Sequence, residues 1–144
     1  MNFLLFGTGQ IASLIMNGMS KSDNGIEIVG VIDNDETKQG KLFYGKTVVG
    51  PECINNFQYD YICILMERYY VNVYNQLFYG YHIDKEKLVD KFFLLKQIMI
   101  NKYRNSTDRD IRDTISYWDK NELTFFNQFE FAPVQFEKVF WDTA

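Results

Sequence analysis

The amino-acid sequence predicts an α/β fold built around a parallel sheet, and three observations carry this prediction. Strand-like apolar runs alternate along the chain with segments whose apolar residues recur at helical spacing. A glycine-rich turn over residues 7–12 follows the first apolar run directly. The second apolar run, residues 26–32, is almost continuous, as in strands that are covered on both faces. These features predict a Rossmann-like parallel five-stranded sheet in the order 3-2-1-4-5, with a C-terminal helical and β appendage.

The predicted strands are short and are separated by helical or polar segments. They comprise residues 2–6, 26–32, 46–49, 59–65 and 87–93. The predicted helices of this part comprise residues 10–19, 51–55 and 68–79. Pro51 suits the first position of a helix and Gly80 the position after one, so these residues indicate two helix bounds. The polar stretch 37–45 is expected to form a loop.

The alternation of predicted strands and helices ends after the fifth predicted strand. A short helical stretch follows, and Ser106 or Thr107 is predicted to cap a further helix whose apolar stripe comprises Ile111, Ile115 and Trp118. Residues 123–126 and 134–141 resemble two strands. We therefore expect a first domain over residues 1–95 and an appendage over residues 96–144 that begins another domain, so that the chain is the front of a longer protein.

Composition excludes several classes of function. The chain has 144 residues and a formal net charge of −4, which argues against the clustered basic surface of a nucleic-acid-binding protein. Its two cysteines, Cys53 and Cys63, lack the spacing of a metal or redox motif and are expected to be free thiols. No apolar run reaches the roughly 20 residues of a membrane span, and no basic segment precedes the first apolar run, so a cytoplasmic location is expected.

The glycine turn is the strongest indication of function. Gly7-Thr8-Gly9-Gln10-Ile11-Ala12 has the G-x-G-x-x-A form of a turn that carries a nucleotide pyrophosphate between a first strand and a first helix. The first glycine allows a tight turn, the second lets backbone N–H groups approach an anion, and the alanine lets the helix pack close to the strand. We therefore expect Gly7, Thr8, Gly9, Gln10 and Ile11 to contact a bound nucleotide.

The end of the second predicted strand supports this interpretation. Asp33 lies 26 residues after Gly7, close to the spacing of roughly 20 that is typical of the ribose-binding acid in such sites. A carboxylate there can accept hydrogen bonds from both ribose hydroxyls, and Asn34 follows it. The alternative is that the glycines only turn the chain and Asp33 caps a loop. The neighbouring Asp35 and Glu36 favour a solvated turn over a metal site.

The end of the fourth predicted strand borders the same crevice in the predicted strand order. Met66 could line a base or sugar there, and Arg68 could pair with a phosphate. The alternative is an ordinary helix start, at which Glu67 favours the positive end of the helix.

Catalytic groups are scarce in the sequence. His82 is the only histidine and is predicted to lie in a loop away from the glycine turn. Class I methyltransferases typically place an acid two residues before the first glycine of a similar loop, and here that residue is Leu5. We therefore expect no catalysis by this chain itself.

Several stretches together resemble a known group of proteins. They are the glycine turn, Val29-Gly30-Val31-Ile32-Asp33-Asn34-Asp35, Lys38-Gln39-Gly40-Lys41, Val49-Gly50-Pro51-Glu52 and Tyr59-Asp60-Tyr61-Ile62-Cys63-Ile64. The chain resembles the Rossmann-like N-terminal domains of polysaccharide-biosynthesis proteins, among them PglD/NeuD-type sugar acetyltransferases and, more closely, FkbM-like methyltransferases. This resemblance implies recognition of a nucleotide or nucleotide sugar. It also implies that the tail leads into a methyltransferase domain.

The sequence thus predicts binding of a nucleotide-containing small molecule, either NAD or a nucleotide sugar. The alternative is a ligand-free module that forms a homodimer or docks a partner domain through the aromatic C-terminal segment. A third possibility is a small NAD-dependent oxidoreductase or epimerase.

Overall fold

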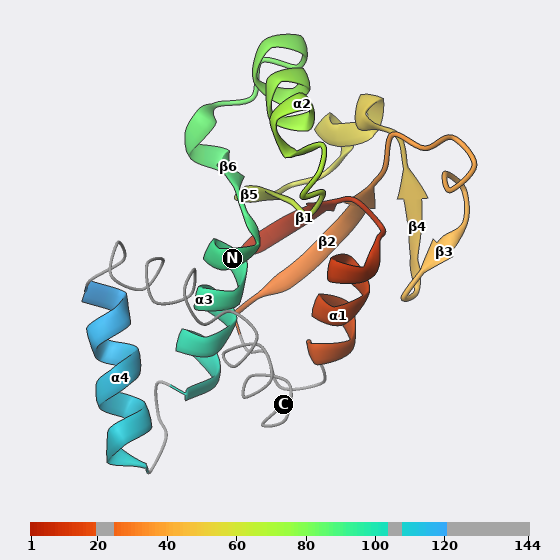
Figure 1. Ribbon diagram of the computed structural model, residues 1–144. Coiled ribbons are helices and arrows are strands. Elements are labelled where there is room, and N and C mark those ends of the chain that lie inside the picture. The colour runs from red at the N-terminus through yellow and green to blue at the C-terminus, as the bar shows by residue number, and fades with distance from the viewer. Residues whose placement is uncertain (20–24, 104–107, 121–144) are drawn as a thin grey trace. The chain divides into compact units, whose positions relative to one another are not determined.

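The computed structural model describes residues 1–19, 25–103 and 108–120 (Figure 1). The chain divides into two compact units. The first comprises Met1–Asn17 and Ile26–Lys91, and the second comprises Gly18–Gly25 and Phe92–Ala144. Each unit is described separately below, and the first contains the sheet.

Six strands form one sheet in the first unit. They are β1 (Asn2–Phe6), β2 (Glu27–Ile32), β3 (Leu42–Phe43), β4 (Lys46–Val49), β5 (Tyr61–Ile64) and β6 (Leu88–Val89). The order across the sheet is β3-β4-β2-β1-β5-β6, with β1 between its parallel neighbours β2 and β5. The predicted α/β class is confirmed, and the five predicted strands occur in the predicted order. The sixth strand, β3, is an addition at one edge.

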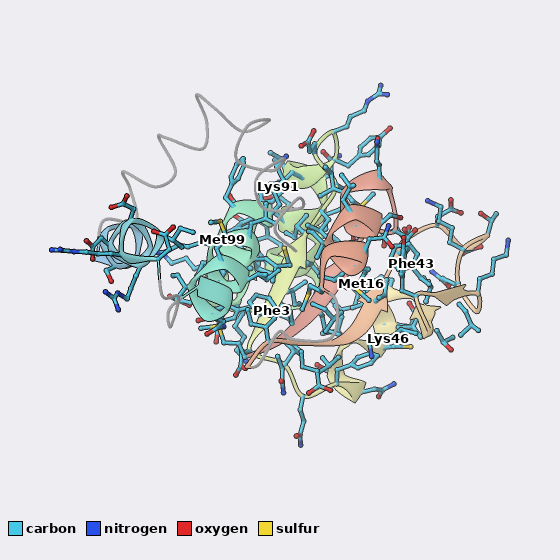
Figure 2. All side chains as sticks on the ribbon, turned by 90° about the horizontal axis from the view of Figure 1, so that it is seen from below. Phe3, Met16, Phe43, Lys46, Lys91 and Met99 are labelled. Atoms are coloured by element: carbon cyan, nitrogen blue, oxygen red, sulfur yellow. The ribbon has the colours of Figure 1, made fainter. Side chains whose placement is uncertain are left out.

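Strand β3 forms from residues that were expected to be a loop. It pairs antiparallel with β4, with Leu42 opposite Thr47 and Phe43 opposite Lys46 (Figure 2). The two residues between the strands, Tyr44 and Gly45, both have positive φ angles, 50° and 82°. Two such residues match the twist of a tight hairpin. Glycine adopts a positive φ angle without strain, whereas the conformation of Tyr44 is uncommon for a residue with a side chain.

Helical segments connect the strands of this unit. Helix α1 is Gln10–Gly18, η1 (Pro51–Asn56) is a 3₁₀ helix, and α2 (Tyr70–Asn75) continues as the π-helical turn η2 (Gln76–Gly80). A short 3₁₀ turn, η3 (Lys85–Lys87), precedes β6. The predicted helix over 68–79 therefore begins two residues later than expected and changes its hydrogen-bond pattern at Gln76.

The prediction of a fifth strand over residues 87–93 is only partly correct. Strand β6 ends at Val89, and helix α3 (Lys91–Tyr103) begins two residues later. Short apolar runs do not distinguish a strand from a buried helix segment by periodicity alone, and the run from Phe92 to Leu95 continues as a helix. Its buried residues include Leu94, Leu95, Ile98 and Met99.

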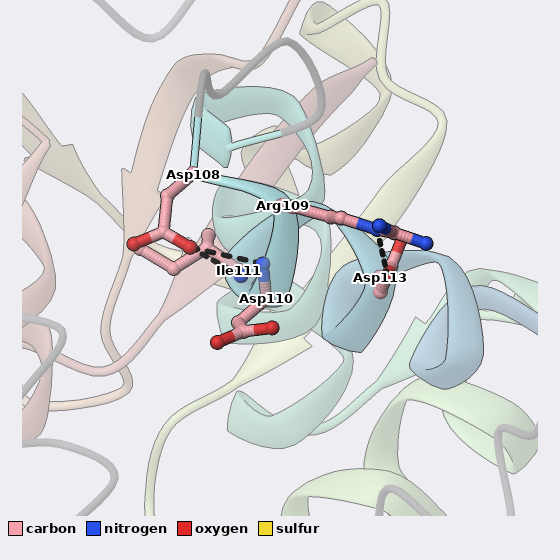
Figure 3. A network of polar contacts seen from close by, with 5 residues as sticks. All are labelled: Asp108, Arg109, Asp110, Ile111 and Asp113. Atoms are coloured by element: carbon pink, nitrogen blue, oxygen red, sulfur yellow. Dashed lines mark hydrogen bonds and ion pairs between the residues drawn. The ribbon is translucent and has the colours of Figure 1, made fainter.

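The second unit contains most of α3 and the whole of α4 (Arg109–Lys120). The carboxylate of Asp108 caps α4, because its Oδ1 accepts hydrogen bonds from the N–H groups of Asp110 at 2.9 Å and Ile111 at 3.3 Å (Figure 3). The cap is thus one residue after Thr107 and two after Ser106, the two predicted caps, which lie outside the described residues. The strands predicted over 123–126 and 134–141 also lie outside them.

One face of the sheet carries the main described core. It contains Leu4 and Phe6 of β1 and Ile62 and Ile64 of β5, with Val73 of α2, Leu77 of η2 and Ile54 of η1 packed in the same cluster. Phe3 and Leu5, also fully buried, alternate with these residues along β1 and therefore point to the opposite face. Since β1 is buried on both faces, its carboxyl end is a rigid base for the turn that follows. Among the described residues, no helix is both long and apolar enough to cross a membrane.

Candidate functional site

The two glycines of the turn after β1 have different structural roles. Gly7 has a φ of 117°, and its N–H donates a 2.7 Å hydrogen bond to the carbonyl of Ile32. A Cβ atom at Gly7 would lie 2.9 Å from Cγ of Met66, so a side chain does not fit there. A Cβ at Gly9 would meet no atom within 4 Å. Gly7 is therefore required to make the turn, while Gly9 keeps the approach to its backbone open.

Helix α1 begins immediately after this turn. The N–H of Ser13 donates to the carbonyl of Gly9 at 3.0 Å, which closes the first helical turn. The first N–H groups of a helix have no partner within it and carry the positive end of the helix dipole. The predicted contact residues Gly9, Gln10 and Ile11 thus lie at the start of α1, where an anion is stabilised. Gly9 and Gln10 are exposed, and Ile11 is half-buried.

Asp33 connects the end of β2 to the glycine turn. Its Oδ2 accepts hydrogen bonds from the N–H of Thr8 at 3.1 Å and from the Thr8 hydroxyl at 2.7 Å. Its Oδ1 accepts a 2.8 Å hydrogen bond from the N–H of Asp35. Asp33 is only 4% exposed. Protein donors therefore contact both carboxylate oxygens, and burial leaves little of Asp33 open to a ribose.

The backbone of Asp33 is also engaged. Its N–H donates to the carbonyl of Val49 at 3.0 Å, and its carbonyl accepts a 2.9 Å hydrogen bond from Nε2 of Gln39. The residue thereby links the ends of β1, β2 and β4. The sequence predicts an acid at the end of the second strand, but it does not indicate that the Asp33 carboxylate turns inward to Thr8.

Asn34 forms a pair with Gln76 that the sequence did not indicate. Nδ2 of Asn34 donates to Oε1 of Gln76 at 2.8 Å, and Nε2 of Gln76 donates to Oδ1 of Asn34 at 3.0 Å. Both bonds lie on the exposed surface. The two residues are 42 positions apart, and Gln76 is the first residue of the π turn η2. No local pattern would have revealed this contact, because it depends on how α2 changes into η2.

The acidic turn after β2 is locally organised. Oδ1 of Asp35 accepts hydrogen bonds from the N–H of Thr37 at 2.9 Å and from its hydroxyl at 2.6 Å. These two bonds lower the pKa of the Asp35 carboxyl below its usual value. In the part of the chain that the structure describes, no group of three or more His, Cys, Asp or Glu residues could hold a metal ion.

The segment after β5 is only partly directed toward the glycine turn. The half-buried side chain of Met66 lies against Gly7, as the distance to its Cγ shows. Arg68 is exposed, with its guanidinium 5.5 Å from the ring centroid of Tyr69. Glu67 forms a 2.6 Å ion pair with Lys91. The structure thus brings Met66 to the turn, whereas Arg68 lies over an aromatic ring.

Two titratable groups near β5 stay protonated at neutral pH. Cys63 is fully buried, and burial, followed by the nearby charge of Asp90, raises the pKa of its thiol well above the usual value. Its Sγ donates to the carbonyl of Asp90 at 3.3 Å. Burial also raises the pKa of Tyr70 to about 12, with a smaller contribution from the charge of Asp90. Neither group is therefore activated as a nucleophile or base.

A parallel α/β sheet with a glycine turn after its central first strand, leading into a helix, defines a protein of Rossmann-like topology. Within this class, the chain belongs to the family described as C2185-like, N-terminal, whose model matches residues 1–89. The matched region runs from β1 to β6 and includes the glycine turn, Asp33, Asn34, Met66 and Gln76.

Solved structures show weaker similarity. UDP-D-quinovosamine 4-dehydrogenase from Vibrio fischeri aligns with 15% identity and a TM-score of 0.45, over 62% of this chain and 74% of that one. A structure described as RSP in complex with β-NAD⁺ and operator DNA aligns with 16% identity and a TM-score of 0.45. The alignment covers 91% of this chain, which spans 61% of that one. The search of curated proteins finds no match.

Proposed function

We propose that residues 1–89 bind a nucleotide-containing ligand, either NAD or a nucleotide sugar, at the carboxyl edge of the parallel sheet. The single observation that carries this proposal is that the two glycines of the turn have different structural roles. Gly7 is confined by its φ angle and by Met66, while the position of a Cβ at Gly9 is open. A turn that served only to reverse the chain would not need the second glycine.

The phosphate groups of the ligand would lie over Gly9 and the start of α1. Backbone N–H groups there present an uncompensated positive end, and the absence of a side chain lets the phosphate oxygens approach. Asp33 serves this site indirectly, because its hydrogen bonds to Thr8 hold the turn in place. Its negative charge is turned into the protein, where both oxygens are already bound.

Met66 and Arg68 would complete the site. Met66 already packs against the turn and offers an apolar surface to a base or sugar. An exposed cation–π contact such as that of Arg68 contributes about 0.5–1 kcal/mol, whereas a hydrogen bond between charged groups contributes about 1.5–3 kcal/mol. A bound phosphate would therefore draw the Arg68 guanidinium away from Tyr69.

We propose further that the binding domain serves a larger glycan-modifying protein and does not catalyse a reaction by itself. The resemblance of the glycine turn and the segment 29–35 to front domains of polysaccharide-biosynthesis proteins supports this role. Cys63 is buried and Tyr70 half-buried, and both stay protonated, which agrees with a site that binds without reacting.

Calorimetric titration tests the binding proposal directly. The chain is titrated with NAD⁺, NADH, UDP-glucose and S-adenosylmethionine, and saturable heat is expected from NAD⁺ or UDP-glucose. Gly9→Ala is expected to weaken that binding about tenfold or more, because a methyl group occupies the space of the phosphate. Gly80→Ala is the matched control, since a Cβ there also meets nothing within 4 Å. The absence of heat from all four compounds would overturn the proposal.

The second candidate function is an interaction module. It is favoured by exposed large side chains on and around α2 and η2, namely Tyr69, Val71, Tyr79 and Tyr81. The dimer predicted through the aromatic C-terminal segment stays a prediction, because residues 121–144 lie outside the described ones. Light scattering of the chain with and without residues 104–144 distinguishes the two functions. A monomer in both cases would count against the interaction module.

A further inference from the structure

We propose that the amide pair of Asn34 and Gln76 recognises the vicinal hydroxyl groups of the ligand's ribose. This inference rests on the proposed nucleotide-binding function and assigns to the pair the contact that such folds usually make through the acid after the second strand. The reason for the reassignment is the state of Asp33. Asp33 is 4% exposed and its carboxylate holds Thr8 and Asp35, so little of it is open to a ligand.

The position of the pair fits this role. Asn34 follows β2, and Gln76 lies in the segment that follows β5. Strands β2 and β5 are the two neighbours of β1, whose carboxyl end leads into the glycine turn. The pair therefore joins the two sides of the edge at which open α/β sheets bind their ligands. A ligand whose phosphate lies on Gly9 would extend along this edge.

The hydrogen-bonding capacity of the pair matches a diol. Each amide has two donor hydrogens and an oxygen with two acceptor sites, and the reciprocal bonds use one of each. Each side chain therefore keeps one N–H and one acceptor site for solvent or ligand. Each hydroxyl of a vicinal diol likewise donates one hydrogen bond and accepts others. The pair can thus bind a diol without being broken.

The pair is also held in a defined geometry before any ligand arrives. The carbonyl of Gln76 accepts a 3.2 Å hydrogen bond from the N–H of Tyr81, which is the five-residue spacing of a π turn. Single π turns within helices occur frequently at functional sites, because the extra residue changes the direction of the side chains. The two amides immobilise each other, so a ligand does not have to order them.

The test compares ribose with 2′-deoxyribose in wild type and variants. ADP and UDP are titrated beside their 2′-deoxy forms into wild type, Asn34→Ala and Gln76→Ala. In wild type, loss of the 2′-hydroxyl is expected to weaken binding about five- to tenfold, which corresponds to the typical contribution of a hydrogen bond. In either variant, the affinity for the ribose nucleotide is expected to fall by a similar factor. The 2′-deoxy nucleotide is then expected to bind almost as tightly as the ribose nucleotide.

Gln58→Ala is the matched control, because Gln58 is an exposed amide in the segment before β5, at the opposite edge of the sheet. It is expected to leave all four affinities unchanged. The urea-unfolding midpoint of each variant shows whether the fold is intact.

The possible failures are distinguishable. If wild type binds none of the nucleotides, the proposed function is wrong, and so is the role of Asn34 and Gln76 in ribose recognition. If wild type binds and Gly9→Ala weakens binding, but the amide variants keep the wild-type preference for ribose, the nucleotide site stands and the role of Asn34 and Gln76 is overturned.

Discussion

At each end of strand β1, an aspartate carboxylate accepts a hydrogen bond from a backbone N–H, but the two aspartates differ in burial. At the carboxyl edge, Asp33 accepts a hydrogen bond from the backbone N–H of Thr8, just after β1. At the amino edge, Asp60 accepts one from the N–H of Asn2, at the start of β1. The second bond is shorter, 2.7 Å against 3.1 Å. Yet Asp33 is buried and Asp60 is exposed.

We expect burial, more than distance, to decide what such a hydrogen bond contributes to the free energy of unfolding. If Asp60 is removed, water can replace the lost oxygen, and the net loss is small. If Asp33 is removed, the N–H and hydroxyl of Thr8 and the N–H of Asp35 lose their acceptor within a nearly closed space. A buried polar group without a partner costs about 1–3 kcal/mol. We therefore expect the Asp33 side chain to stabilise the carboxyl edge of the sheet more than the Asp60 side chain stabilises the amino edge.

The largest expected effect tests this contrast directly. Asp33→Ala is expected to lower the free energy of unfolding by about 3 kcal/mol, and Asp60→Ala by less than about 1 kcal/mol. Urea unfolding followed by circular dichroism gives both values. Equal losses at the two positions would show that burial does not separate the two contacts.

The second effect separates structure from binding within the carboxyl edge. Gly7→Ala places a Cβ 2.9 Å from Cγ of Met66 in a backbone with a φ of 117°. A loss of about 2 kcal/mol in the free energy of unfolding is expected. Gly9→Ala should lower the free energy of unfolding by less than about 1 kcal/mol, because its Cβ has space. The same substitution should weaken nucleotide binding. Denaturant unfolding and calorimetry measure the two quantities. A large stability loss at Gly9 would contradict the assigned roles.

The sequence predicts the frame of this site because the frame depends on local patterns. Apolar runs with intervening glycines indicate the strands and the turn, and right-handed crossovers then determine the order of the predicted strands. The roles of Gly7 and Gly9 also follow from local backbone chemistry. The direction of a side chain does not. Whether Asp33 points outward or toward Thr8 depends on neighbouring strand ends, and the sequence shows only that an acid is present.

Other features were missed for the same reason. Gln76 contacts Asn34 only because α2 gives way to a π turn, and no spacing of apolar residues reveals that change. Strand β3 was overlooked because Tyr44 is an uncommon residue for a position with a positive φ angle. Helix α3 was taken in part for a strand because residues 92–95, near its start, are uniformly apolar.

The smallest expected effect compares two tyrosines that flank β5. Tyr59 lies before the strand, toward the amino edge, and Tyr70 lies after it, toward the carboxyl edge. Burial is the main cause that raises the pKa of both phenols, that of Tyr70 to about 12. An unfolded tyrosine has a pKa of about 10, so it releases its proton first as the pH rises. The unfolded state then binds fewer protons than the folded state, and stability falls with rising pH.

Above about pH 10, each tyrosine therefore lowers the free energy of unfolding as the pH rises, and for Tyr70 this decline continues to about pH 12. Tyr70→Phe is expected to remove more of this decline than Tyr59→Phe, whose pKa is shifted less strongly. Urea unfolding of wild type and both variants at several pH values gives the three slopes. Cys63 contributes to this decline in all three proteins, and because its charge is a minor cause of the raised pKa of Tyr70, Tyr70→Phe also removes that interaction. Parallel slopes for the two variants would mean that the carboxyl end of β5 shields its phenol no better than the amino end.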